Sequence, residues 1–301
     1  MKTLKFILKF MLLTFSYTVV NAVVFALLPF SVNFKTASLS QNAAPYGMVF
    51  TTVSTVWTVG TICFIRVNSA KKTRAYLLAA VGSVFFVQSF MTQIETLFFG
   101  HAFTTLSRCD TFLIVLAGAF PVFVAGMLAM VLFKRFDEQK LPKLNWGKFG
   151  VIAVLNGLIY MVVYFIFGYF VAWQSPELRL FYSGSTEMIS FSEKLLDNFR
   201  TSPVIYPFQW MRGVLFTFSV LPLLRMRWKH KYDYFVGVVL VFLCAAVVLV
   251  IPNFLFPDAV RWTHFVEMFG SMLLFGVLTG VLTKRALSEQ KTVYSISEMA
   301  V

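Results

Sequence analysis

Long apolar stretches separated by short polar ones run along the whole sequence. Each stretch holds about twenty residues, the length that an α-helix needs to cross a hydrocarbon core roughly 30 Å thick. The pattern predicts eight membrane-spanning helices, at residues 10–28, 47–65, 76–99, 111–133, 150–173, 208–224, 234–251 and 260–283. We therefore predict an all-α fold, a polytopic integral membrane helix bundle that forms one transmembrane domain over residues 1–301.

Composition agrees with this class. Hydrophobic residues make up 58% of the chain and charged residues only 13%, which lies outside the range of ordinary soluble domains. The first apolar stretch follows Lys2, Lys5 and Lys9, so a cleaved signal peptide is an alternative to a first membrane span. Its apolar run is longer than a typical signal peptide core, which favours the span.

The net charge of +13 can be explained by where the basic residues lie along the chain, without a nucleic-acid partner. Most basic residues gather in every second polar segment, at residues 2–9, 66–74, 134–148, 225–231 and 284–291. Cytoplasmic loops of membrane proteins carry such an excess of lysine and arginine. We therefore predict a multi-pass plasma membrane protein, the inner membrane in a bacterium, with both termini cytoplasmic and membrane lipids as its partners. We expect no nucleic-acid partner.

Residues 174–206 form the longest polar connection and are expected on the extracytoplasmic side. Ser190 stands three residues ahead of Glu193, as in a capping box, and apolar residues after it can gather on one side of a helix. The segment predicts a short amphipathic helix. Such a helix can cap the bundle or act as a lid over a site, and the sequence leaves both readings open.

The eighth span carries ionisable residues where lipid would disfavour them. Arg261, His264 and Glu267 are three residues apart and share one face of the helix, and Ser271 extends that face. A charged group exposed to hydrocarbon costs several kcal/mol, so these side chains are expected to face the bundle interior.

Two other spans bring polar residues to a similar depth. Gln88 and Glu95 lie near the outer end of the third span, and Gln209 and Arg212 begin the sixth. The planar guanidinium of Arg212 can bind carboxylates in a bidentate manner, so it is the expected partner of Glu95, Glu267 or both. The sequence thus predicts one outward-facing polar site built from the third, sixth and eighth spans. Its expected ligand-binding residues are Gln88, Glu95, Gln209, Arg212, Arg261, His264 and Glu267.

Three functions are compatible with such a site. In a non-catalytic membrane subunit, the charges would serve helix packing alone. Small residues pack membrane helices without buried charge, and the eighth span already has a GxxxG pattern at Gly276 and Gly280.

In a binding or transport protein, the arginines would suit a small polar or anionic ligand or a lipid head group, while the carboxylates and His264 could relay protons.

The third function is a membrane-embedded enzyme that modifies lipids. His264 and Glu267 are the best candidates for catalytic residues, as an acid–base pair. They are also spaced to ligate one metal ion, with Glu95 as a further ligand. A known metal-binding motif such as HExxH is missing from the chain, and the sequence identifies no cofactor.

We take binding or movement of a small polar or anionic ligand, or of a lipid head group, as the working function. The lipid-modifying enzyme is the first alternative and the structural subunit the second. A protein partner is compatible with all three. The sequence does not identify the ligand.

Overall fold

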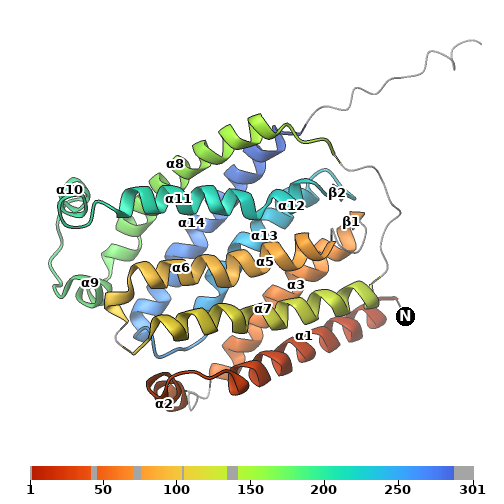
Figure 1. Ribbon diagram of the computed structural model, residues 1–301, viewed down its shortest axis with the longest axis horizontal. Helices are drawn as coiled ribbons and strands as arrows, with labels where there is room; N and C mark the ends of the chain where they lie inside the picture. Colours follow the sequence, from red (N-terminus) through yellow and green to blue (C-terminus); the bar gives the residue numbers. More distant parts are fainter. Residues whose placement is uncertain (1, 42–45, 71–75, 104, 134–141, 288–301) are drawn as a thin grey trace, which may run out of the picture.

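The computed structural model confirms an all-α, multi-pass bundle. It describes residues 2–41, 46–70, 76–103, 105–133 and 142–287. Within these ranges, seven helical segments are long and apolar enough to cross a membrane. They are Thr3–Leu27, Gly47–Asn68, Leu78–Phe98, Arg108–Leu132, Trp146–Gln174, Asp233–Val250 and Asp258–Lys284. Figure 1 shows most of the long helices lying lengthwise beside one another.

The long helices make up most of the described chain. They are α1 (Lys2–Leu27), α3 (Gly47–Asn68), α7 (Arg108–Leu132), α8 (Trp146–Phe170), α13 (Asp233–Val247) and α14 (Asp258–Lys284). Shorter α-helices are α2 (Val32–Gln41), α5 (Ser83–Phe85), α6 (Met91–Phe98), α9 (Pro176–Ser183), α10 (Phe191–Thr201), α11 (Ile205–Ser219) and α12 (Leu221–Leu224). Single 3-10 turns are η3 (Gly100–Ala102), η4 (Ala172–Gln174) and η5 (Val248–Val250). Two short antiparallel strands, β1 (Ser69–Ala70) and β2 (Arg227–Trp228), pair Ser69 with Trp228.

The third expected span is less regular than its sequence predicts. Two π-helical turns, η1 (Leu78–Gly82) and η2 (Phe86–Phe90), interrupt it before α6. A π turn holds an extra residue and therefore changes which side chains share a face; such turns are frequent at functional sites. Gln88 and Ser89 lie in η2, at the start of the polar part of this span.

The sixth expected span is the one that the seven long segments do not include. It consists of α11 and α12, which are separated at Val220 just before Pro222. Proline lacks the N–H that would continue the helix and clashes with the preceding turn, which explains the break. Whether this segment crosses the membrane stays a prediction, and so do the count of eight spans and the side on which the termini lie.

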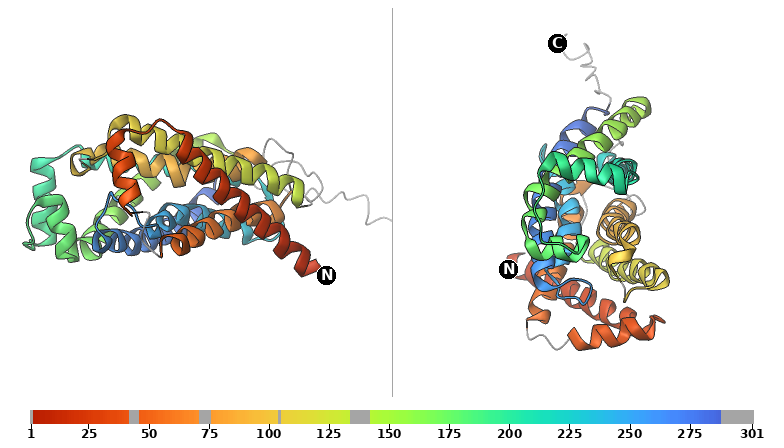
Figure 2. Two further views of the ribbon diagram at one scale, coloured as in Figure 1. Left: turned by 90° about the horizontal axis from the view of Figure 1, so that it is seen from below. Right: turned by 90° about the vertical axis from the view of Figure 1, so that its left-hand side faces the viewer.

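The helices form two groups that meet along α13. In one group α8 packs on α11 and α14, and α14 packs on α13; in the other α1 packs on α7 and α3. Contacts of α3 and η2 with α13 join the groups. The end view in Figure 2 shows α8, α11 and α14 on one side and the third span with α7 on the other.

Glycines set how closely the helices of the first group approach. On α14, Gly276 lies against Val239 and Gly280 against Phe235 of α13, so the GxxxG pattern is a helix-packing surface. Between α8 and α11 the approach is closer still. A Cβ on Gly213 would lie 2.9 Å from the Cα of Gly157.

Basic side chains satisfy the last carbonyls of α7. Arg66 donates to the carbonyls of Met130 and Phe133 at the end of α7, and Lys9 donates to Leu132 beside them. The last carbonyls of a helix have no partner within it, and a cation there also complements the helix dipole. Lys9 and Arg66 therefore have a structural role in addition to the orienting role predicted from sequence.

The short helices α2, α9 and α10 lie at the end of the bundle opposite the N-terminus (Figure 1). Residues 174–206 fold as α9 and α10 with connecting loops. Ser190 and Glu193 form a reciprocal capping box at the start of α10. In α9, the Ser175 side chain caps the helix and Arg179 donates to the carbonyls of Trp173 and Gln174. This segment is therefore fixed against the end of α8.

Candidate functional site

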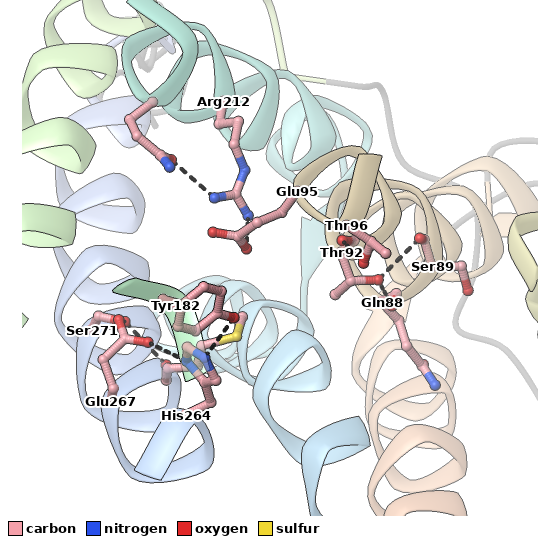
Figure 3. A network of polar contacts seen from close by, with 12 residues as sticks. Gln88, Ser89, Thr92, Glu95, Thr96, Tyr182, Arg212, His264, Glu267 and Ser271 are labelled. Carbon is pink, nitrogen blue, oxygen red and sulfur yellow. Dashed lines mark hydrogen bonds and ion pairs between the residues drawn. The ribbon is translucent and has the colours of Figure 1, made fainter. Parts of the chain in front are cut away.

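The best-defined ion pair in the bundle joins α6 to α11. Arg212 Nη2 donates to Glu95 Oε2 at 2.7 Å, and Arg212 Nη1 donates to Gln209 Oε1 at 2.9 Å (Figure 3). The Arg212 side chain is 1% exposed and that of Glu95 is 25% exposed. We call Glu95, Gln209 and Arg212 the ion-pair cluster. It brings together three of the side chains that the sequence predicts to lie in one site.

Aromatic rings enclose the guanidinium of Arg212. The centre of the group lies 5.5 Å from the ring centroid of Tyr160 and 5.8 Å from those of Phe208 and Phe216. Cations are attracted to aromatic faces at such distances, and the attraction grows when water is excluded. Arg212 is therefore buried and held by one carboxylate, one amide and three rings.

A second polar group lies on α14. His264 Nε2 shares a hydrogen bond of 3.0 Å with the hydroxyl of Tyr182, and His264 Nδ1 lies 3.8 Å from Glu267 Oε2. Ser271 Oγ donates to Glu267 Oε1 at 3.4 Å. We call these four residues the histidine cluster; Figure 3 shows it across an interval from Glu95. Tyr182 comes from α9, so residues 174–206 contribute directly to the site.

Tyr182 keeps its proton. Burial raises the pKa of its hydroxyl, and the neighbouring carboxylates of Glu95 and Glu267 raise this pKa further. Tyr182 was not among the residues predicted from sequence, because spacing within a polar loop does not show which side chain turns inward.

A large cavity connects the two clusters. Its volume is about 1260 Å³, and its lining includes Glu95 of the first cluster and Tyr182, His264, Glu267 and Ser271 of the second. Residues of α1, α2, α3, α7, α8, α10, α13, η5 and the loop at 251–256 also line it. Much of this wall is aromatic, as in Phe98, Phe99, Tyr160, Tyr164, Phe165 and Tyr169. The cavity thus has a charged region within a mainly apolar surface.

Arg261 lies apart from this cavity, although its spacing on α14 predicted a place in the site. Its Nη1 donates to the carbonyls of Leu249 and Val250 at the end of η5, and its Nη2 pairs with Asp258 at 2.8 Å. The side chain is 1% exposed. A guanidinium is well suited to satisfy terminal carbonyls, so Arg261 caps the preceding helix and ties the loop before α14 to it.

Replacing Arg261 by alanine is expected to destabilise the protein by about 1 to 3 kcal/mol, because buried carbonyls lose their donor. Ligand occupancy of the cavity should stay unchanged in the fraction that folds. Thermal unfolding in detergent would measure the first effect and native mass spectrometry the second. The exposed Arg108 provides the control, since Arg108→Ala should leave the melting temperature near that of the parent.

The two glutamines predicted for the site lie in different surroundings. Gln209 is fully buried behind Arg212 and does not line the cavity. Gln88 lines the cavity but points away from Glu95, accepting from Thr58 and donating to Tyr17 (Figure 3). Gln88 lies within the π turn η2, whereas Glu95 lies in the regular helix α6 after it, so the helical spacing of the sequence did not place both on one face.

Two polar residues between the end of α6 and the first turn of α7 differ in whether they line the cavity. His101 lines the cavity. Asp110 instead accepts from Ser31 and forms a capping box with Ser107 at the start of α7. These bonds hold the α1–α2 connection against α7, which gives Asp110 a structural role.

The arrangement does not gather a metal-binding set. Within the part of the chain that the structure describes, no three His, Cys, Asp or Glu side chains lie together so that they could hold a metal ion. Glu95 pairs with Arg212, and His264 shares a hydrogen bond with Tyr182. Glu267 therefore lacks the two further ligands that a metal site built from these three residues would need.

The chain shows no significant similarity to any protein-family model, curated protein or solved structure with which it was compared. The cavity and its side chains are therefore the basis on which function is inferred.

Proposed function

We propose that this protein binds, within its membrane-spanning bundle, a ligand that has a polar head and an apolar body, and that it presents or moves this ligand. The observation that carries the proposal is the cavity of about 1260 Å³ in which Glu95, His264 and Glu267 occur among aromatic side chains. Ligand sites are typically concave and mainly apolar, with a few polar groups that fix orientation.

The size and composition of the cavity favour an amphiphile over a small inorganic ion. Typical ligand pockets measure roughly 300 to 1,000 Å³, so this cavity is large enough for an organic molecule of lipid or drug size. A small hydrated ion would leave most of the aromatic wall without contacts. A lipid, or a molecule that resembles one, would place its head at the carboxylates and its chain against the rings.

The position of the cavity supports movement as well as binding. Its wall is shared by both helix groups, and the ion pair between Glu95 and Arg212 crosses from one group to the other. Breaking or forming one strong contact between two helix groups would open or close such a cavity. We propose a plasma membrane location with α2, α9 and α10 on the extracytoplasmic side, on the basis of the alternating basic segments.

One observation favours a second function, a membrane-embedded enzyme that acts on lipids. Tyr182, His264 and Glu267 form a chain in which a carboxylate faces one imidazole nitrogen and a phenol faces the other. Such a chain can move a proton to or from a substrate in the cavity. Conversion of a lipid by the purified protein, and its loss in His264→Ala, would favour this function over binding alone.

The binding proposal can be tested by filling the cavity. Gly168 of α8 lines it, and a Cβ there meets no atom within 4 Å. Gly168→Trp is therefore expected to place an indole in the cavity without disturbing the helix, and to lower ligand occupancy at least tenfold. Native mass spectrometry of the purified protein would measure occupancy.

Gly150→Trp is the matched control, because Gly150 also lies on α8 in open space but does not line the cavity. Retention of the ligand in this variant and its loss in Gly168→Trp would support the proposal. Equal occupancy in both variants would place the ligand elsewhere on the protein. An empty parent protein, examined directly from membranes in the mildest detergent that extracts it, would favour the structural subunit.

A further inference from the structure

Of the arginines and carboxylates that the sequence predicted for the site, only the carboxylates line the cavity. Neither of the two arginines expected to attract an anion lines it: Arg212 is enclosed by rings and paired with Glu95, and Arg261 caps a helix. The charged side chains that the membrane-spanning helices do present are the carboxylates of Glu95 and Glu267. We propose that the polar head of the ligand is an organic cation, an ammonium or a comparable delocalised monovalent cation, bound chiefly at Glu267; this inference rests on the proposed function.

Glu267 is the stronger of the two carboxylates for this role. Among the described residues, no lysine or arginine forms an ion pair with it; its neighbours are His264, which is charged only when protonated, and Ser271. Its side chain is only 10% exposed. A carboxylate removed from water without a cation is costly, so a cationic ligand would gain much of its affinity by compensating this charge.

Glu95 would contribute less. Its charge is already offset by Arg212 at 2.7 Å. The pair nevertheless leaves part of the Glu95 carboxylate facing the cavity, since this side chain is 25% exposed while Arg212 is not accessible from there. A cation bound near Glu267 would therefore meet a second, partly neutralised acidic group and no accessible guanidinium.

The aromatic part of the wall is compatible with a cation as well. Tyr160 and Tyr164 of α8 and Tyr182 of α9 line the same cavity as Glu267. Aromatic faces attract ammonium groups by up to about 2 kcal/mol where water is excluded. An anion would gain nothing from these faces and would be repelled by both carboxylates.

Two lysines also line the cavity, and their positions bear on whether the cation is part of a zwitterionic lipid or a free molecule. Lys35 and Lys194 belong to the short end helices α2 and α10, and Lys194 is already paired with Asp197 and stacked over Trp173. His101 lines the cavity from the loop after α6. A zwitterionic lipid could place its phosphate toward these groups and its ammonium toward Glu267, whereas a free organic cation would use Glu267 alone. The two sources share the cationic head and can be separated by experiment.

Tetraphenylphosphonium and tetraphenylborate provide a matched pair of probes, because they have the same shape and opposite charge. Equilibrium binding to the full-length protein in phosphatidylglycerol nanodiscs is measured for both probes, and each affinity is corrected for the partitioning of that probe into protein-free nanodiscs, because the anionic lipid attracts the phosphonium and repels the borate. After this correction, saturable binding of the phosphonium is expected to be at least tenfold tighter than any saturable binding of the borate. Glu267→Gln should weaken phosphonium binding at least tenfold, and Glu95→Gln should weaken it less. Glu187→Gln, a change at an exposed loop position outside the cavity, should have no effect.

The parent protein alone tests the sign of the preferred charge, so the experiment does not depend on the stability of any variant. Tighter binding of the borate, competed by a cavity-filling Gly168→Trp, would overturn the cationic ligand while leaving the proposed function in place. Saturable binding of neither probe, together with an empty cavity in native mass spectrometry, would overturn both. Phosphonium binding that is unaltered in a folded Glu267→Gln protein would overturn the assignment to Glu267.

A second arm identifies the source of the cation. The protein is incubated with equal amounts of phosphatidylethanolamine and phosphatidylglycerol, and the retained lipid is identified by native mass spectrometry. Retention of the ethanolamine lipid, displaced by tetraphenylphosphonium, would support a lipid head group. Phosphonium binding without enrichment of that lipid would support a free organic cation, and enrichment of phosphatidylglycerol would count against both.

Discussion

Replacing Glu95 by alanine is expected to destabilise the folded protein by about 3 to 5 kcal/mol, the range for removing one partner of a buried ion pair. The reason is the guanidinium that the change leaves behind. Arg212 is 1% exposed, and Glu95 is the carboxylate with which it pairs. Gln209 and the surrounding rings would remain, but they cannot neutralise the full charge of a buried guanidinium.

A double-mutant cycle would isolate this interaction. Glu95→Gln and Arg212→Met are each expected to be destabilising, whereas the double variant should be more stable than the sum of the two changes predicts. Unfolding in mixed micelles of SDS and a mild detergent would measure the free energies. Glu187→Ala, at an exposed position, is the control and should change the free energy by less than about 0.5 kcal/mol. Additive effects in the cycle would mean that the pair does not stabilise the fold.

The pairing of Glu95 with Arg212 could be anticipated from sequence because hydrocarbon imposes a strong rule. Charges within apolar spans must face the interior and find a partner, and few such charges are present in this chain. The same rule, with span length, predicted the all-α multi-pass bundle. Where only a short list of residues can satisfy a physical constraint, spacing along the chain is informative.

Other features depend on contacts that spacing does not reveal. Arg261 shares a helical face with His264 and Glu267, yet it reaches backward to the carbonyls of Leu249 and Val250. A long basic side chain near the start of a helix can donate to the last carbonyls of the preceding helix. The sequence pattern is the same whether the side chain does this or faces a site. Tyr182 was missed for the opposite reason, since the fold of residues 174–206 decides which of its side chains reaches α14.

The difference at Arg261 and Arg212 changes the interpretation of the site. Read from sequence, two arginines favour an anionic ligand. In the folded chain one of them caps a helix and the other is enclosed by rings, so that neither lines the cavity. The charged residues predicted for a site from sequence are therefore a poor guide to the charge that a ligand meets there, because both arginines have structural roles and do not line the cavity.

Gly213→Val is expected to have the second large effect, a loss of about 3 kcal/mol in the free energy of unfolding, because α8 and α11 approach each other here without room for a side chain. A Cβ at position 213 would lie 2.5 Å from the Cβ of Tyr160 and 3.0 Å from the carbonyl oxygen of Asn156. Backbone atoms of α8 cannot move aside as a flexible side chain can. The two helices would separate, and Arg212, the preceding residue, would be displaced from Glu95.

Gly150→Val on α8 tests whether this effect comes from packing. A Cβ at position 150 meets no atom within 4 Å, so the variant should differ from the parent by about 0.5 kcal/mol or less. Unfolding of both variants in mixed micelles would give the comparison. If the displacement of Arg212 contributes, the cost of Gly213→Val should be smaller in a Glu95→Gln, Arg212→Met background, where no ion pair can be lost. An equal cost in both backgrounds would mean that the glycine contact acts through helix packing alone and that the ion pair adapts to it.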